Sequence, residues 1–509
     1  MEVAIPKICG IETEYGIVVK GANINPIAAS SVLINSYLVE LGHHQGRADL
    51  RVGWDFDDEH PSNDARGDVY GFEAFAPEIE SHLVNSVITN GARYYVDHAH
   101  PEYSSPECGD AHEALLYDKA GERILLASMR AAAQQLPAGQ EIVVYKNNSD
   151  GKGNSYGCHE NYLMDRNVPF GRIVHQATAH FVTRQIYTGA GKVGGENGVR
   201  LPADDPFQLT QRADFFEAEV GLETTLKRPI INTRDEPHCD PKRFRRLHVI
   251  VGDANMCEVA TFLKLGVTSI ILSMIEDGAY PAELELASPV AAMHNVSHDT
   301  SLRRPIQLDN KSWITALDLQ WRLFEAASKF AISHGMASVG VEVGEHIMRR
   351  WEQVLTGLES DPMQLKGQID WVAKLALFEA FRERHRLPWN AVQLKALDLQ
   401  YHDIRPEKSI FDRLGTEQLL TADSIDHAVE YPPESTRAYF RGRCVAKYPA
   451  NIVAANWDSI MFDTGGDNLR RVPLMDPMRG TAQHVGRLID TSDTAVDLLN
   501  ALEGHDTKE

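Results

Sequence analysis

The sequence lacks the cysteine patterns of a disulfide-stapled or zinc-binding protein. Its six cysteines (9, 108, 158, 239, 257 and 444) are scattered, and none forms a Cys-x-x-Cys pair. The N-terminus shows no secretory pattern, and we expect no apolar run of membrane-spanning length. These absences predict reduced thiols, a cytoplasmic location and no membrane partner.

Basic residues are scarce relative to acidic ones. The chain has 50 lysines and arginines against 72 aspartates and glutamates, a formal net charge of −22 over 509 residues. Nonspecific nucleic-acid binding needs a basic surface, so we expect no nucleic-acid partner. A hydrophobic content of 43% is ordinary for a globular protein, and the length allows more than one domain.

Several catalytic signatures are also absent. No second histidine follows His159-Glu160 at zincin spacing. Gly189-Ala-Gly-Lys192 lacks the full Walker spacing and carries little weight as a phosphate loop. A hydrolase with this sequence would therefore depend on a carboxylate, Mg²⁺ and a nucleotide.

The most informative segment that is present runs from Asn90 to Cys108. Its first part, residues 93–97, alternates like a strand and places Arg93, Tyr95 and Asp97 on one face; a proline-punctuated loop is expected to follow. Aligning a cation, a phenol and a carboxylate does little for a structural protein. The same alignment suits a metal–nucleotide site.

A second alternating run, Gly10 to Gly16, points Glu12 and Glu14 the same way. Two like charges on one strand face repel unless a cation lies between them. Oxygen ligands favour Mg²⁺ or Mn²⁺. A solvated edge strand with two surface glutamates is the alternative, but together with the 90–108 segment the pair favours a metal.

Other candidates depend on their context. His159 and His248 sit in strand-like segments, where a neutral imidazole could bind metal and a cation could hold phosphate, although a lone histidine is more often a hydrogen-bonded structural residue. Arg212 and Arg234 could clamp phosphate. Trp457 could stack on a purine, although tryptophan is more often part of a core.

The order of elements predicts an α+β fold with an antiparallel sheet. Helix is expected at 28–41, 258–275 and most of 311–400, and strand at 141–145, 159–162 and 244–251. Residues 43–71 have few aliphatic side chains and no clear period, which predicts a long mobile loop. Pro432-Pro433 is the expected boundary between a domain at 1–431 and a small domain at 432–509.

Six motifs together resemble the Pup ligase/depupylase family, Pup being the prokaryotic ubiquitin-like protein. They are Glu12-Thr-Glu-Tyr-Gly, the run from Asn90 to Tyr103, Lys146-Asn-Asn-Ser-Asp, Tyr156-Gly-Cys-His-Glu-Asn-Tyr, Asn232-Thr-Arg-Asp-Glu-Pro-His and the run from Leu247 to Met256. The resemblance covers nearly the whole chain. It implies a glutamine synthetase-like large domain, with a curved antiparallel sheet that cradles ATP and Mg²⁺ and is packed by helices, and a small C-terminal domain.

The family has a ligase branch, which joins Pup to lysines, and a deamidase branch, which converts the C-terminal glutamine of Pup to glutamate and cleaves Pup from conjugates. The sequence resembles the deamidase branch, because 43–71 looks like the insertion of that branch. The implied partners are Pup and pupylated proteins. A Pup–protein ligase and a non-catalytic, nucleotide-dependent Pup-binding scaffold are the alternatives.

The resemblance also implies roles for single residues. Mg²⁺ would be bound by Glu12, Tyr95 and Glu102, with Glu14, His159 and His248 completing the metal and phosphate shell. ATP, or ADP with phosphate, would be bound by Arg93, Ser105, Arg212, Arg234 and Trp457. Asp97 would be the catalytic carboxylate, either as a general base or as a nucleophile, unless phosphate itself attacks.

Two further expectations concern access for Pup. The loop at 43–71 is predicted to gate or shape the entry of the Pup tail, so that its deletion would alter the rate without unfolding the protein. Pup is acidic and disordered, and the cluster Lys242-Arg-Phe-Arg-Arg246 is one candidate for its docking surface, although a charge run is more often a solvated face.

Overall fold

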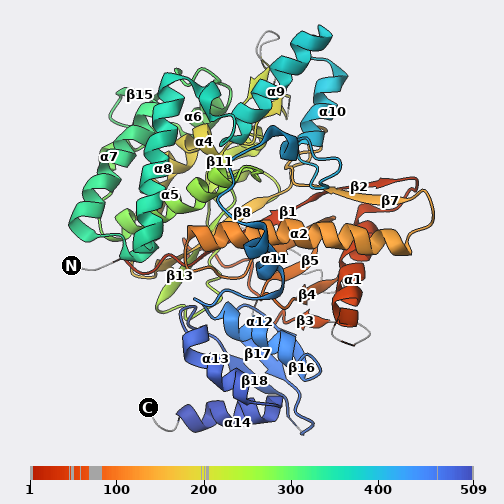
Figure 1. The fold of residues 1–509 in the computed structure, drawn as a ribbon. Coiled ribbons are helices and arrows are strands. Elements are labelled where there is room, and N and C mark those ends of the chain that lie inside the picture. Colours follow the sequence, from red (N-terminus) through yellow and green to blue (C-terminus); the bar gives the residue numbers. More distant parts are fainter. Residues whose placement is uncertain are drawn as a thin grey trace.

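The computed structural model describes residues 4–44, 46, 51–57, 59–67, 83–196, 198–199, 201, 206–466 and 468–506 (Figure 1). Its centre is a 10-stranded sheet. In spatial order the strands are β13 (Phe244–Val249), β8 (Cys158–Asp165), β1 (Cys9–Glu14), β6 (His100–Ser104), β5 (Arg93–Asp97), β4 (Asn85–Val87), β3 (Val52–Trp54), β16 (Ile452–Ala455), β17 (Ser459–Phe462) and β18 (Arg470–Pro473). Every pairing is antiparallel except that of β3 with β16.

Helices and four smaller strand pairs accompany the sheet. The helices are α1 (Pro26–His44), α2 (Ala111–Gln135), α3 (Phe170–Thr183), α4 (Gln185–Thr188), α5 (Glu258–Glu276), α6 (Pro289–Ser297), α7 (Ala316–His334), α8 (Val341–Ser360), α9 (Asp370–His385), α10 (Val392–Tyr401), α11 (Ala422–Glu430), α12 (Ala438–Lys447), α13 (Ala482–Thr491) and α14 (Ala495–Asp506). The smaller pairs are β2 (Gly16–Lys20) with β7 (Glu141–Tyr145), β9 (Lys192–Val193) with β10 (Phe207–Gln208), β11 (Phe216–Gly221) with β12 (Arg228–Asn232), and β14 (Pro305–Gln307) with β15 (Trp313–Thr315). The predicted α+β class, strands and helices are confirmed.

One face of the central strands is covered by helices. Figure 1 shows α2 crossing the strands, with α1 beside it, and α2 contacts both β1 and α5. The Tyr94 hydroxyl bonds Ser128 of α2 at 3.0 Å, and a Cβ on Gly121 of α2 would lie 2.5 Å from the ring of Tyr103. Because side chains alternate along a strand, the residues between these buried ones point to the other face, away from α2.

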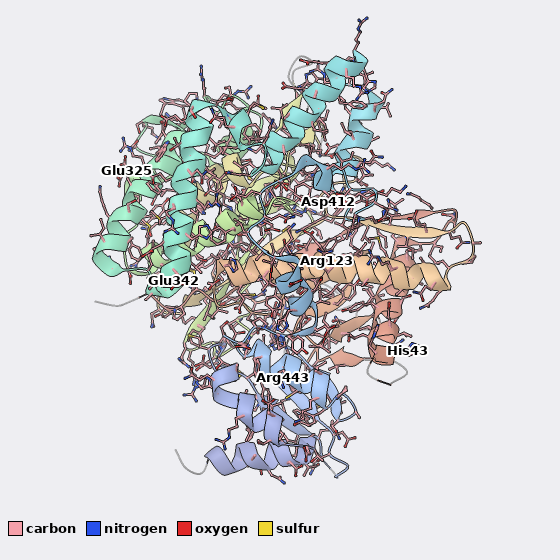
Figure 2. All side chains as sticks on the ribbon, viewed as in Figure 1. His43, Arg123, Glu325, Glu342, Asp412 and Arg443 are labelled. Carbon is pink, nitrogen blue, oxygen red and sulfur yellow. The ribbon has the colours of Figure 1, made fainter. Side chains whose placement is uncertain are left out.

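Charged side chains also mark the surface of the helical region formed by α7 and α8. Glu325 on α7 and Glu342 on α8 are exposed and lie on the outside of the molecule (Figure 2). Neither side chain forms a hydrogen bond or an ion pair in the described part of the chain. They provide neutral positions for control substitutions.

The predicted loop after Asp97 is wrong over residues 100–104, which form β6 despite the proline at position 101. The backbone nitrogen of Tyr15 donates to the carbonyl of Pro101 at 3.0 Å, and Tyr15 comes directly after the last residue of β1. The backbone nitrogen and carbonyl of Pro101 therefore face a residue that no longer belongs to β1. Pairing of β6 with β1 begins only at Glu102. The missing N–H of the proline therefore interrupts no ladder bond.

The predicted loop at 43–71 is also partly wrong. Residues 52–54 form β3, which pairs with β4 on one side and β16 on the other and so joins the two halves of the sheet. Trp54 packs edge-on against Trp457, with ring centroids 5.2 Å apart. Deleting 43–71 would remove a sheet strand, so we now expect it to destabilise the fold. Residues 45, 47–50, 58 and 68–71 of this stretch lie outside the described residues.

The predicted boundary at 432 stays a prediction. The central sheet continues across it, because β16 pairs with β3, and Val52 and Val87 share one buried cluster with residues of α12, β16 and β17. All six cysteines are buried and free, as expected for reduced thiols.

One membrane-length apolar helix exists, contrary to expectation. Helix α5 is long and apolar enough to cross a membrane, with a mean hydropathy of 1.6. The whole of this apolar stretch is buried inside the protein. Its charged side chains are bonded inside the protein: Lys264 donates to the backbone carbonyl of Asp253 at 2.9 Å, and Glu276 forms an ion pair with Lys7 at 2.6 Å. These are the features of a central core helix.

Candidate functional site

The face of the sheet away from α2 carries a row of polar side chains placed opposite one another by the strand register. Glu12 on β1 lies opposite His159 on β8. Glu14 lies opposite Glu102 on β6, and Glu102 in turn lies opposite Tyr95 on β5. The sheet therefore assembles residues that are far apart in the sequence.

A first group of metal-ligand type consists of Glu12, His159 and His248, whose ligand atoms all lie within 4.8 Å of one another. The Nδ1 atom of His159 lies 3.5 Å from Oε2 of Glu12. Asn161 fixes two members, because its Nδ2 donates to Glu12 at 2.6 Å and its Oδ1 lies 2.9 Å from Nδ1 of His248. Burial raises the pKa of Glu12, but the hydrogen bond with His159 and nearby positive charge hold it well below its usual value.

A second group consists of Glu14, Asp97 and Glu102, again within 4.8 Å of one another. Burial, followed by the charges of Asp97 and Glu14, raises the pKa of Glu102 well above 4.5. Burial also opposes ionisation of Glu14, but the hydrogen bond with His100 lowers the pKa of Glu14 to about 2. The group thus holds more negative charge than its surroundings neutralise, which fits a divalent cation with oxygen ligands.

Arg93 lies beside these carboxylates in a fixed position. Its guanidinium carbon is 4.0 Å from the ring centroids of both Trp54 and Tyr95. Its Nε donates to Asn85 at 3.0 Å, and its Nη1 lies 3.4 Å from Glu59. A stacked guanidinium held in this way is pre-organised to meet an anion.

A cavity of about 550 Å³ opens over this face. Among the predicted residues, its lining contains Glu12, Arg93, Tyr95, Asp97, Glu102, His159, Arg234, His248 and Trp457. A smaller cavity of about 80 Å³ continues from it between the sheet and Trp457, and Ser105 lines that one. The second cavity has apolar walls, including Ile8 and Leu163, and suits a flat base, while the first suits phosphates and metal.

Three of the residues predicted to bind nucleotide differ in their surroundings. Ser105 bonds backbone groups, accepting from the nitrogen of Ile11 at 3.0 Å, so its role in ligand binding stays a prediction. Arg234 lines the larger cavity; its buried Nε has no hydrogen-bond partner in the described structure and lies 3.8 Å from Oε2 of Glu236. Arg212 lines neither cavity and bonds the carbonyls of Ile250 and Gly252.

Sequence reasoning missed several polar residues of this site. Arg246 lines both cavities, donates to Asn161 at 2.8 Å and lies 3.9 Å from Glu12. His238 also lines both cavities and adopts a left-handed backbone with φ of 48°. The alternation of Phe244–Val249 could have placed Arg246 on the same face as His248; nothing in the sequence marks the backbone of His238.

The basic cluster at 242–246 does not form a single docking surface. Arg245 is buried and donates to the carbonyl of Val168, whereas Arg246 points into the site from the opposite face of β13. Only Lys242 and Arg243 are exposed. The four basic side chains of this cluster therefore do not share one exposed surface, because strand alternation divides them; docking of Pup at Lys242 and Arg243 stays a prediction.

Residues 59–67 lie against the wall of the site. Asp64 forms an isolated bridge with Arg234 and accepts from the hydroxyl of Thr233 at 2.9 Å. The backbone nitrogen of Asp235 donates to the carbonyl of Asn63 at 2.8 Å. This part of the predicted loop is therefore next to the site, as expected, but it is tied down by backbone bonds; whether it gates access stays a prediction.

The chain is similar to proteins whose names are known. A family model described as Pup-ligase protein matches residues 7–461. A depupylase of Acidothermus cellulolyticus is 50% identical over 509 residues, covering 98% of this chain and 99% of the relative. A Pup deamidase/depupylase of Mycolicibacterium smegmatis is 46% identical over 507 residues, covering 97% and 99%.

Two solved structures are also similar. The complex between Pup and its ligase PafA aligns with a TM-score of 0.78 and 29% identity, covering 99% of this chain and 95% of that one. The Pup ligase PafA in complex with ADP aligns with a TM-score of 0.71 and 34% identity, covering 80% of this chain and 89% of that one.

Proposed function

This chain belongs to the Pup-ligase protein family, and we propose that it hydrolyses amides: it deamidates the C-terminal glutamine of Pup and releases Pup from pupylated proteins. The relatives that are 46–50% identical over nearly the full length carry names for this hydrolysis. The solved structures of the Pup ligase PafA are only 29–34% identical in sequence to this chain. The hydrolase is therefore favoured over the ligase.

The observation that carries the chemistry is the group of Asp97, Glu14 and Glu102 at the end of the polar row. Asp97 is the most exposed of the three, with 36% of its side chain accessible, whereas Glu14 is at 13% and Glu102 is buried. A reacting group must reach the substrate, and a metal ligand can stay covered. This supports Asp97 as the catalytic carboxylate and the two glutamates as ligands.

Nucleotide and Mg²⁺ fit the residues present. Trp457 and Ser105 border the apolar cavity that would take the base, and Arg93 and Arg234 border the larger cavity that would take phosphates. Glu12, Glu14, Glu102, His159 and His248 would hold metal, with the phenol of Tyr95 beside them. Bound Mg²⁺–nucleotide would supply positive charge that polarises the substrate carbonyl.

The chain's own residues then account for the amide hydrolysis. Asp97 either takes a proton from water, which attacks the side-chain carbonyl of the substrate, or attacks that carbonyl itself. The C–N bond breaks, and the nitrogen leaves with the proton as ammonia or as the lysine amine. If water attacked, the Pup side chain is now a carboxylate; if Asp97 attacked, water then cleaves the acyl bond to Asp97, which gives the carboxylate and frees Asp97. Arg93 and Arg246 are placed to stabilise the negative charge that develops.

The test is a product assay. The protein is incubated with Pup ending in glutamine, ATP and Mg²⁺, and the product is identified by mass spectrometry. Conversion of the terminal amide to acid is expected, followed by release of Pup from a conjugate. If Pup stays unchanged while ATP and Pup both bind, the hydrolase is wrong, and a second incubation with Pup ending in glutamate and a target lysine separates the ligase from a scaffold.

A further inference from the structure

His98 lies beside Asp97 and lines the same cavity. Its Nδ1 atom is 3.1 Å from Oδ2 of Asp97, and both residues border the cavity of about 550 Å³. The other histidine of this hairpin faces a different carboxylate, because Nδ1 of His100 lies 3.5 Å from Oε2 of Glu14. His98 is therefore the histidine that is placed to act together with Asp97.

The backbone of His98 turns its ring toward Asp97. Asp97 pairs with His100 across the hairpin, so that His98 and Ala99 alone form the turn between β5 and β6. Consecutive side chains of a strand point to opposite faces, and a straight continuation of β5 would carry the ring of His98 away from Asp97. His98 instead has a φ of 51°, a left-handed conformation that glycine adopts most easily. A histidine kept in this conformation next to a reacting group suggests a role in the reaction.

The turn is fixed on both sides, and the ring is open to solvent. The hydroxyl of Ser30 on α1 donates to the carbonyl of Ala99 at 2.9 Å. The ring of His100 packs against that of Tyr156, with centroids 4.5 Å apart. The side chain of His98 keeps 66% of its surface exposed. The imidazole can thus reach a substrate bound at its neighbouring carboxylate and can exchange protons with water.

We propose that His98 donates a proton to the nitrogen that leaves when the side-chain amide or the isopeptide bond is cleaved. This inference rests on the proposed function. An alkylamine or ammonia leaves a tetrahedral intermediate only after its nitrogen has received a proton, and histidine is the side chain that most often supplies one. The leaving nitrogen is bonded to the carbon that is attacked at Asp97. The Nδ1 atom of His98 lies on the same side of the cavity.

The step is the same whichever attack Asp97 supports. As the C–N bond breaks, its electron pair stays with the nitrogen, which takes the Nδ1 proton of His98 and leaves as ammonia or as the lysine amine. If Asp97 has taken a proton from water, that proton passes to His98 and both groups are restored. If Asp97 has attacked the carbonyl itself, His98 recovers a proton from solvent while water cleaves the acyl bond.

A histidine that only held Asp97 in place would show the same contact, and His98→Asn separates the two roles. Asparagine tolerates the left-handed backbone, so the turn should be kept. Its side-chain amide places a nitrogen where Nδ1 of the imidazole lies and can still hold the carboxylate of Asp97. It cannot give up a proton to a leaving group. Loss of activity in this variant therefore reports proton donation.

The experiment compares two leaving groups on one enzyme preparation. Pup ending in glutamine and Pup ending in glutamate with a phenyl ester on its side chain both yield Pup ending in glutamate, but phenolate leaves without a proton. We expect His98→Asn to lower kcat for the amide by about a hundredfold or more. Its kcat for the ester, measured above the enzyme-free rate, should fall by less than about threefold. The ratio of the two rates cancels any loss of folded protein.

The other outcomes contradict the inference. A loss that is equal for both substrates, or larger for the ester, shows that His98 only positions Asp97, and an unchanged amide rate shows that it has no part in the reaction. Both results leave the hydrolase intact, whereas failure of the wild type to hydrolyse the amide contradicts the proposed function.

His175→Asn is the matched control. Nδ1 of His175 on α3 lies 3.8 Å from Oε2 of Glu285, and 68% of the histidine side chain is exposed, so its surroundings resemble those of His98. His175 lines neither cavity of the site. Its substitution should leave both rates unchanged, and a change in their ratio there would show that the effect at His98 is not specific.

Discussion

Glu14 of β1 and Glu102 of β6 lie directly opposite each other in the antiparallel register, on the face of the sheet away from α2. Like charges in such a cross-strand pair repel. Asp97 adds a third carboxylate within 4.8 Å. The fold therefore concentrates negative charge at one point, and the first prediction tests whether a divalent cation stabilises it.

Mg²⁺ with ATP should raise the unfolding temperature of the protein, and Glu102→Gln should remove most of that rise. The amide keeps the shape of the side chain but loses its charge, so the metal-free variant should be at least as stable as the metal-free wild type. Thermal unfolding with Mg²⁺ and with a chelator measures both effects. Glu325→Gln, on the exposed face of α7, is the matched control; a full Mg²⁺ response in Glu102→Gln would remove this residue from the ligand set.

Asp97→Asn should reduce turnover by about a thousandfold or more while nucleotide affinity changes less than about twofold. Asparagine keeps the size of the side chain but is neither a base nor a nucleophile. Deamidation kinetics and nucleotide titration measure the two quantities separately. Near-normal turnover would contradict the assignment of Asp97, and a parallel loss of nucleotide binding would make it a binding residue instead.

Stability should fall on acidification through Glu107. Burial raises the pKa of this carboxyl, but the charges of Arg441 and Arg437 lower it to about 2. A group whose folded pKa lies below its ordinary value of 4.5 stabilises the fold above that value, and the contribution is lost as the pH falls from 4.5 to about 2. The shift corresponds to about 3 kcal/mol.

Denaturant unfolding at a series of pH values checks this. Glu107→Gln should be destabilised at neutral pH, since it leaves two buried guanidinium groups without their partner, and its stability should depend less on pH below about 5. Glu342→Gln on the exposed face of α8 should match the wild type. Identical pH profiles for Glu107→Gln and the wild type would show that another group causes the acid sensitivity.

Trp457→Ala should weaken nucleotide binding by about tenfold, and Trp457→Phe by much less, because an aromatic ring preserves stacking on a base. The Trp457 side chain is held by Arg441, whose guanidinium carbon is 4.9 Å from the ring centroid. Titration with ADP gives the affinities. Trp313→Ala, at a 64% exposed tryptophan outside both cavities, should leave them unchanged; an equal effect there would show that the loss is not specific to the site.

Local periodicity was reliable where a single strand decides the outcome. The alternation in residues 93–97 correctly placed Arg93, Tyr95 and Asp97 on one face. The same reasoning applied to residues 244–249 would have placed Arg246 in the site. Treating 242–246 as one charged cluster overlooked that the strand divides its side chains between two faces.

Non-local pairing produced the remaining errors. Residues 100–104 can form a strand because the backbone nitrogen of Pro101 faces a residue beyond the end of β1, where no N–H is needed. The local sequence does not predict where β1 ends. Val52–Trp54 joins a sheet in a stretch of low aliphatic content because β4 and β16 supply its hydrogen-bond partners. Those partners come from distant parts of the chain.

The sequence by itself determined the residue chemistry, the period of each strand and the resemblance to a family, since these depend on neighbours along the chain. Only the tertiary structure decided that Glu12 meets His159, that Glu14 meets Glu102, and that Arg212 lies outside the nucleotide cavities. Register between strands is set by packing of the whole sheet against α1, α2 and α5, and that packing depends on the entire chain.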